Sequence, residues 1–577
     1  MKSKISASII ILAIALVAGC GGNTTTPPAP VPAPGPTPVS VVFTSTPPVS
    51  ASQGQSYVYA VTASAGTATV TYQLASGPGG ATLTGNTLTW TPTTSQARVA
   101  NSFSVVATAN GVTSHQDWSV TPAGVVQGTK ITTHLTDAGS VQSPQDTSVI
   151  PVGAMVPAAG GYNTLTATGS PAGDYTFASL PGGYFWLDGL LQTYFWTNLS
   201  AVDLGSDTLG RPTAALPSNP IQLRFELTGL NPWQTTDRQQ LYVANNGTSM
   251  SRDWSAWGLA AGSTSLDQTI SWTDPMLDSS EEDKAYVTQL VTTPTLTSSS
   301  VLAVKKASGE LEIETTDAGS LVVEGALTDV PLNLTMRGNI HGSAFAQLES
   351  AMNPAAIPDS TYFYVDVQPG GLAKGWVGTT PDLVIFDGTG NPIRTDTDMG
   401  DIAFGNPYPA EWSKFFDYIQ YVRVNYTAPG ATNSVSDVAS IEVQSASLPT
   451  SSAAVVPVIG PVQNPKVNNS NFFNAVSSAG ATPVISWNAP ALGTATGYIV
   501  EVFHLYNNDV DSVSEYVGKV YTKTTSIQLP TGYLTVGNSY YFRISAIAEP
   551  GVDYEAAPLR HAFPRSVAQS LSGVVTP

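Results

Sequence analysis

The side chains best suited to chemistry are few and widely spaced in this chain. None of the five histidines lies three to five residues from another histidine or from a cysteine, the pairing that zinc sites need; they are His115, His134, His341, His504 and His561. No Gly-x-Ser-x-Gly turn follows a strand pattern, and no glycine-rich loop carries a phosphate-binding lysine. The sequence therefore predicts no catalytic residue, no metal ligand and no cofactor.

Three acidic clusters carry oxygen-bearing side chains that could bind a cation. The first has oxygen-bearing side chains in a glycine-containing loop, which suits calcium, but it lacks the glutamate that closes an EF-hand loop. We interpret it as a hairpin turn and a solvated loop. The other two are interpreted in the same way. The clusters are Asp387–Asn391 with Asp396, Asp398 and Asp401; Glu281–Asp283; and Asn507, Asn508, Asp509 and Asp511.

Aromatic side chains crowd two short regions. They comprise Tyr184, Phe185, Trp186, Tyr194, Phe195 and Trp196, followed later by Trp254 and Trp257. Exposed aromatics on a β-surface grip sugars or anchor protein interfaces. Because side chains alternate between the two faces of a strand, core filling is the interpretation we favour.

The only cysteine, Cys20, lies near the N-terminus. Lys2 and Lys4 give a positive start, and the apolar run Ile9–Val17 is short for a permanent bilayer span, so the segment is typical of a signal peptide. A lone thiol in an exported chain has no internal disulfide partner. It makes sense as an acyl acceptor.

The string Leu16–Cys20 resembles the lipobox of bacterial lipoproteins. The resemblance implies cleavage between Gly19 and Cys20, lipid on Cys20, and the membrane as a partner through that lipid. Gly21, in place of aspartate, favours the outer membrane if the cell is Gram-negative. The alternative is an ordinary signal peptide with an incidental cysteine. Residues 20–38, rich in proline, are expected to form a flexible tether.

Composition limits the possible partners. The formal net charge is −19, from 22 Lys and Arg against 41 Asp and Glu. This balance argues against nucleic-acid binding, which needs a basic face. A length of 577 residues predicts several domains. The oligomeric state is left open.

The recurring pattern is the short alternating strand bounded by turn residues, which predicts an all-β string of β-sandwiches. The segment 343–352 alone predicts a helix, with Phe345, Leu348 and Met352 on one face. Strands are expected at Tyr57–Val61, Val70–Leu74, Phe103–Ala107, Ile221–Leu227, Ala285–Leu290, Leu311–Glu314, Tyr362–Val367 and Tyr418–Val424.

Two N-terminal segments resemble known modules. Residues 39–124 are similar to the Ig-like, cadherin-like modules of bacterial surface proteins, through Gly54, the string Leu88–Pro92, and Phe103 with Val105. Residues 125–212 resemble carboxypeptidase-regulatory-like sandwiches through the strand–turn–strand at Gly173–Leu187. Both resemblances imply sandwich folds, and the second implies a structural spacer. Residues 213–450 are expected to form a central β-rich domain.

The C-terminal segment, 456–577, resembles a fibronectin type III domain. The residues that carry the likeness are Trp487 on an early strand and Tyr540, six residues after Leu534. In that family the tryptophan packs under the tyrosine. The sequence departs from the family at Val536, often proline there, and in a long insert near Asn507–Ser514. We expected this domain to lie farthest from the membrane.

Two functions remain open from the sequence. The first is a non-enzymatic surface or envelope lipoprotein for adhesion, scaffolding, or binding of a glycan or protein ligand. The second is a secreted glycan-acting hydrolase whose site lies in the central region. The hydrolase predicts two carboxylates facing across one cleft.

Overall fold

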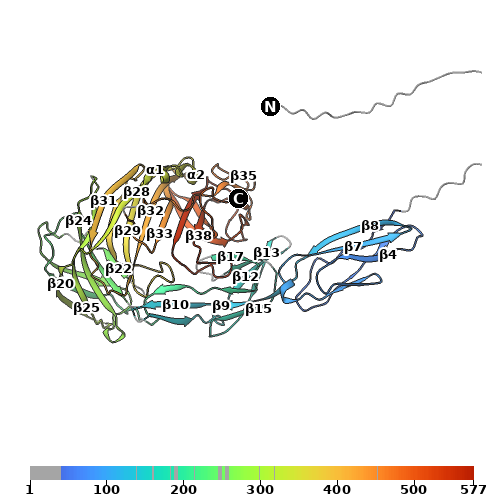
Figure 1. Cartoon of the computed structure of the whole chain (residues 1–577), viewed down its shortest axis with the longest axis horizontal. Helices are drawn as coiled ribbons and strands as arrows, with labels where there is room; N and C mark the ends of the chain where they lie inside the picture. Colours follow the sequence, from blue (N-terminus) through green and yellow to red (C-terminus); the bar gives the residue numbers. More distant parts are fainter. Residues whose placement is uncertain are drawn as a thin grey trace, which may run out of the picture.

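The computed structural model describes residues 40–137, 139–158, 161–181, 183–186, 193–213, 215–244, 250–253, 259–297, 299–317, 319–450 and 453–577. Its regular structure is almost wholly β, arranged as a series of sandwiches, and the all-β class expected from the sequence is confirmed (Figure 1).

The first sandwich comprises residues 40–123, and its core forms because buried and exposed side chains alternate along its strands. Tyr57 and Tyr59 are buried while Val58 between them is exposed. Phe103 stacks on Trp118 at 5.0 Å between ring centroids. The strands are β1 (Val42–Phe43), β2 (Tyr57–Ala60), β3 (Ala63–Ser64), β4 (Thr71–Ser76), β5 (Thr82–Thr84), β6 (Thr87–Trp90), β7 (Asn101–Ala109) and β8 (Val112–Val120), with a 3₁₀ turn η1 (Thr94–Gln96).

The second sandwich follows directly. One sheet has the order β14-β15-β9-β18 and faces strands β12, β13, β16 and β17, with Tyr175, Phe177 and Phe195 buried between. A small sheet β11-β10-β19 extends from it. The strands are β9 (Gly124–Thr129), β10 (Ile131–Thr136), β11 (Gly139–Pro144), β12 (Gly153–Ala158), β13 (Gly161–Thr166), β14 (Thr168–Gly169), β15 (Asp174–Leu180), β16 (Gly183–Trp186), β17 (Thr193–Thr197), β18 (Ala201–Asp203) and β19 (Asp207–Leu209).

One arginine joins the first two sandwiches. Arg98 lies two residues after the end of η1. Its backbone is in the left-handed region, with φ +61°, and the residue is 1% exposed. Its guanidinium donates to four backbone carbonyls of the second sandwich, those of Leu180 (3.1 Å), Pro181 (2.8 Å), Thr197 (2.8 Å) and Asn198 (3.2 Å). Burial lowers the pKa of Arg98 to about 10, which leaves it charged at neutral pH.

The third sandwich places the sheet β23-β20-β26 over β21, β22, β24 and β25. Trp272 is completely buried in its core with Leu223 and Phe225. The strands are β20 (Ile221–Thr228), β21 (Arg238–Ala244), β22 (Met250–Asp253), β23 (Ser265–Trp272), β24 (Lys284–Thr293), β25 (Val301–Glu312) and β26 (Ser320–Ala326), with a 3₁₀ turn η2 (Ser279–Glu281).

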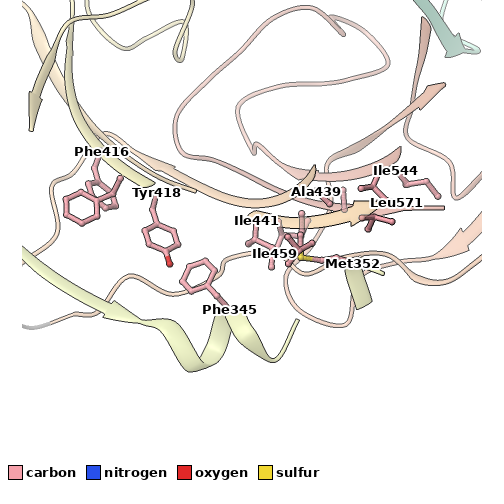
Figure 2. Close-up of a cluster of buried hydrophobic side chains, with 14 of the residues drawn as sticks. Phe345, Met352, Phe416, Tyr418, Ala439, Ile441, Ile459, Ile544 and Leu571 are labelled. Carbon is pink, nitrogen blue, oxygen red and sulfur yellow. The ribbon is translucent and has the colours of Figure 1, made fainter. Parts of the chain in front are cut away.

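The fourth sandwich carries the only two α-helices of the described residues. Phe345 of α1 packs on Tyr418 at 4.6 Å between ring centroids, on the face of the sheet that also holds Phe416 and Ile441 (Figure 2). The elements are β27 (Thr328–Asp329), β28 (Leu334–His341), α1 (Gly342–Ala346), α2 (Glu349–Met352), β29 (Ile357–Gln368), β30 (Asp382–Gly388), β31 (Asp396–Phe404), β32 (Ser413–Tyr426) and β33 (Val435–Ser445).

The single helix expected over 343–352 was wrong in its continuity. The structure has two short helices interrupted at Gln347 and Leu348. Phe345 and Met352 are buried and Leu348 is half-buried, so the face predicted from the spacing is the packed face.

The fifth sandwich places the sheet β35-β34-β36-β39 over β37, β38, β40 and β41. Trp487 meets Tyr498 edge-to-face at 5.2 Å between ring centroids, and the Tyr540 hydroxyl accepts a hydrogen bond from the Thr535 amide. The strands are β34 (Gln463–Val467), β35 (Ser470–Asn471), β36 (Val484–Asn488), β37 (Gly497–Asn508), β38 (Asp511–Thr522), β39 (Ser526–Gln528), β40 (Ser539–Ala548) and β41 (Arg565–Leu571).

One continuous sheet runs through sandwiches two to five. Its pairings follow the path β13-β12-β16-β17-β38-β37-β40-β41-β33-β32-β29-β30-β25-β24-β21-β22, with β27 on β25. The expected units 125–212, 213–450 and 456–577 therefore all contribute strands to the same sheet. The C-terminal sandwich does not end a row, because β38 pairs in parallel with β17.

In Figure 1 this sheet forms an arch. Strands β28 and β31 and both helices lie on its outer side, and β9, β10 and β15 run across its open side. Leu135, Leu209 and Val377 form a small buried cluster there, and Arg211 pairs with Asp283 at 2.7 Å. These contacts connect the second sandwich to the fourth and the third, so the two ends of the arch are joined.

The two faces of the arch differ in chemistry. On β32, Phe416 and Tyr418 point to the outer core, and the alternating Asp417 and Tyr421 point inward. Residues opposite them on β33 and β41, Gln444 and Arg565, share the inner face. Because alternation has period two, one sheet presents an apolar outer face and a polar inner face.

Candidate functional site

A pocket of about 470 Å³ lies on the inner face, where the second, fourth and fifth sandwiches meet. Strand β19 and the loop 376–379 contribute one part of the wall. Strands β33 and β41 and the segment preceding β41 contribute the rest. The lining residues are Asp207, Trp376, Val377, Gly378, Thr379, Gln444, His561 and Arg565. This volume is within the range of small-molecule sites, about 300–1,000 Å³.

Arg565 is the central cation of the pocket. Its Nη1 donates to Glu442 Oε1 at 3.5 Å, and its Nε lies 3.5 Å from Glu549 Oε2. Burial acts to lower the pKa of Arg565, but the charges of Glu442 and Glu549 outweigh burial and raise it. The guanidinium is therefore held charged between two carboxylates.

Glu549 organises the segment that precedes β41. Its carboxylate is completely buried, accepts hydrogen bonds from the Tyr554 hydroxyl and from the Ala562 amide (2.6 Å), and lies 3.4 Å from His561 Nδ1. Burial acts to raise the pKa of Glu549, but His561, Tyr554 and Arg565 lower it below its usual value. Glu549 is therefore an anion that positions His561 at the pocket wall.

Asp207 supplies a buried acceptor from the second sandwich. Its side chain is 0% exposed, and its Oδ1 lies 2.7 Å from Arg560 Nη1. The same guanidinium binds Asp203 through Nε at 2.9 Å. Among the described residues, Asp207 Oδ2 has no hydrogen-bond partner.

Gln444 supplies a second buried acceptor, from β33. It is 1% exposed, and its Nε2 donates to Glu442 Oε1 at 2.6 Å. Its Oε1 has no partner within the described part of the chain. Since a buried polar atom without a partner costs about 1–3 kcal/mol, two such oxygens at one pocket favour a ligand that brings hydrogen-bond donors.

Trp376 is the exposed aromatic of the pocket, with 41% of its surface accessible. Its indole Nε1 donates to Thr380 Oγ1 at 3.2 Å, and Thr380 in turn donates to Asp366 Oδ2 at 2.9 Å. Burial and the neighbouring Asp382 raise the pKa of Asp366 well above its usual value. This chain of hydrogen bonds fixes the orientation of the indole.

The arrangement combines an oriented aromatic ring, two unpartnered acceptors, and the Arg565 and His561 side chains. Hexoses present an apolar ring face and several hydroxyls that donate and accept hydrogen bonds. A pocket with an aromatic ring and convergent polar groups therefore matches a sugar ring.

The sequence candidates fall in different places. Gly19 and Cys20, and the lipid attachment expected there, lie outside the described residues, as do Trp254 and Trp257. The side chains of Tyr184, Phe185 and Trp186 are likewise outside the description. Tyr194 and Phe195 are buried and Trp196 packs against the core, so core filling is confirmed for these three.

Most carboxylates of the three acidic clusters bind other side chains of the protein. Asp387 binds Arg238 at 2.7 Å, Asp396 accepts from Ser343 at 2.7 Å, and Arg337 binds both Asp398 and Asp401. Asp283 pairs with Arg211, and Asp511 accepts from Asn433 at 2.7 Å. Among the described residues, no group of three or more His, Cys, Asp or Glu is placed to hold a metal ion.

Of the five histidines, only His561 lines the pocket. His134 Nδ1 lies 3.1 Å from the Gly210 carbonyl oxygen, His341 pairs with Asp396 at 3.0 Å, and His504 stacks near Tyr506. Sequence reasoning did not select Trp376, Asp207, Gln444 or Arg565. They come from four separate elements, and only the alternation of polar residues on β33 and β41 gave a local signal.

Comparisons with known proteins add little to this geometry. No family model matches the sequence, and no curated protein is similar to it. A solved structure described as Sidekick-1 immunoglobulin domains 1-5 aligns at 9% identity, over 93% of this chain and 99% of that chain, with a TM-score of 0.14. A score this low carries no argument, so the class, an all-β protein of several β-sandwiches, rests on the strands described above.

No helix in the described ranges has the length and apolar character needed to span a bilayer.

Proposed function

We propose that this chain is a bacterial surface or envelope lipoprotein that is anchored by lipid on Cys20 and binds a glycan without chemical turnover, in adhesion or scaffolding. The observation that supports glycan binding is the pocket, where half-exposed Trp376 lies beside the unpartnered acceptors of Asp207 and Gln444. The lipobox-like string Leu16–Cys20 supports the anchor, with the outer membrane favoured in a Gram-negative cell.

At this pocket, binding is favoured over hydrolysis by the state of the nearby carboxyl groups. A glycosidase needs one carboxyl whose pKa is raised, as the acid, facing a second that is ionised. The carboxylate that lines the pocket, Asp207, is paired with Arg560. Asp366 and Asp417 have raised pKa values because they are buried, and neither lines the pocket.

The glycan test uses the purified full chain on an array of bacterial and host glycans, with Trp376→Ala as the variant. Loss of the aromatic contact should weaken binding about 5- to 150-fold, because a stacked ring contributes about 1–3 kcal/mol. Tyr506→Ala, at a ring 36% exposed outside the pocket, is the matched control and should bind as the wild type does. Equal binding by both variants, or release of sugar products during incubation, would contradict the proposal.

The anchor is tested by fractionation of cells that express Cys20→Ser. The serine cannot form the thioether, so the protein should leave the membrane pellet and lose radiolabel from palmitate. Retention of the variant in the pellet would refute lipid anchoring and leave the glycan test unaffected.

A further inference from the structure

The charges around the pocket are unbalanced. Arg560 is shared by two carboxylates, Asp203 at 2.9 Å and Asp207 at 2.7 Å. Arg565 is likewise shared by Glu442 and Glu549, each at 3.5 Å. Among the ion pairs of the described residues, each cluster therefore joins two carboxylates to one guanidinium. His561 lies 3.4 Å from Glu549 in the second cluster, so the excess of negative charge is clearest in the Arg560 cluster.

The cation that lines the pocket is already occupied. Arg565 lies between two carboxylates, so an acidic ligand would compete with both of them for one guanidinium. In contrast to this paired cation, the acceptor atoms Asp207 Oδ2 and Gln444 Oε1 have no hydrogen-bond partner among the described residues. An unpartnered carboxylate oxygen beside net negative charge is complementary to a protonated amine.

From these charges we infer that the pocket takes an amino sugar, with its ammonium group at Asp207 and its ring against Trp376. This inference rests on the glycan-binding function proposed above and specifies the sugar class. A neutral sugar fills the same volume and brings hydroxyl donors, but leaves the negative charge uncompensated. An acidic sugar adds a further anion near the carboxylate pair Asp203 and Asp207 and the pair Glu442 and Glu549.

The test compares β-1,4-linked trimers of glucose, glucosamine and glucuronic acid. Glucosamine differs from glucose only in the amine at C2, and glucuronic acid only in the carboxylate at C6. Calorimetric titration of the full chain at pH 5.5 in low salt, where the glucosamine amines are protonated, should give the tightest binding for the glucosamine trimer. We expect it to bind about tenfold more tightly than the glucuronic acid trimer, with the glucose trimer between them. The preference should shrink in 0.5 M salt, because screening weakens the charge contribution.

Two variants locate the contact. Asp207→Asn should lower the affinity for the glucosamine trimer toward that for the glucose trimer. Asp203→Asn removes one charge from the same Arg560 cluster at a residue that does not line the pocket, and should keep the preference. The wild-type comparison decides the sugar class even if Asp207→Asn does not fold.

The outcomes separate the two proposals. Equal binding of all three trimers, or tightest binding of the acidic one, overturns the inference and leaves glycan binding standing. An equal loss of preference in Asp203→Asn and Asp207→Asn also overturns it, because the effect would then be a diffuse field and not a contact. Absence of binding to every trimer and to the whole array refutes the proposed function and the inference with it.

Discussion

Replacing Arg98 should free the first sandwich from the second. The Arg98 guanidinium is the donor to four carbonyl groups of the second sandwich, at 2.8–3.2 Å. Arg98→Ala removes all four hydrogen bonds and keeps the backbone of the first sandwich. Because the four carbonyls lie at the ends of two separate strands, β15 and β17, no single neighbouring side chain can replace the guanidinium.

The magnitude follows from those four bonds. At about 1 kcal/mol of net stabilisation for each, the substitution should cost about 4 kcal/mol in the docking of the two sandwiches. Arg98→Gly also relieves the left-handed backbone at φ +61°, which costs a non-glycine residue about 1 kcal/mol, so its loss should be about 3 kcal/mol. Arg98→Lys keeps the charge and loses the planar fork, which places it between wild type and alanine.

Small-angle scattering and limited proteolysis measure the effect directly. Arg98→Ala should broaden the distribution of interdomain distances and speed cleavage near residues 120–125, where the two sandwiches join. Arg224→Ala is the control, because its guanidinium pairs with Asp267 on the exposed surface and should not affect docking. Scattering and cleavage rates equal to wild type in Arg98→Ala would refute the reasoning, as would a glycine variant less stable than the alanine variant.

Two further predictions concern stability. Phe345→Ala removes the completely buried ring that packs on Tyr418 and should lower the free energy of unfolding by about 3–5 kcal/mol in denaturant titration. Val536→Ala, at a position that is 71% exposed, should have little effect. Similar unfolding midpoints for both variants would contradict the packing in Figure 2. Burial and the neighbouring Asp382 raise the pKa of Asp366 in the folded protein above its unfolded value of about 4. The folded protein therefore has its full stability from this neutral carboxyl below about pH 4, and it loses that stability as pH rises through the folded-state pKa. Asp366→Asn should therefore gain melting temperature relative to wild type as pH rises from 4 to 9, and a difference independent of pH would count against the burial of a charge there.

The strands could be predicted from the sequence because burial repeats every two residues. Ile221–Leu227 alternates apolar and polar side chains, and Leu223 and Phe225 are buried as that pattern requires. The same rule places Tyr362–Val367 and Tyr418–Val424 inside β29 and β32. Local alternation specifies which face of a strand is apolar, and it contains no information about the partner strand.

The shared sheet and the pocket could not be predicted for that reason. The pairing of Thr193–Phe195 with Lys519–Tyr521 joins segments far apart in the chain, and no local pattern marks either as an edge. The pocket residues come from β19, the loop 376–379, β33 and the start of β41, so the site exists only after these elements pack. A single tryptophan in a loop gives no signal until the structure shows that Trp376 remains exposed.

The parallel pairing of β17 with β38 also makes the second sandwich depend on the C-terminal one. The edge of β17 has no partner there until Lys519–Tyr521 has been made, about 320 residues later. An open strand edge is a template for pairing with other chains. A chain truncated before residue 519 would leave that edge of β17 without its partner strand, and we expect such a chain to aggregate.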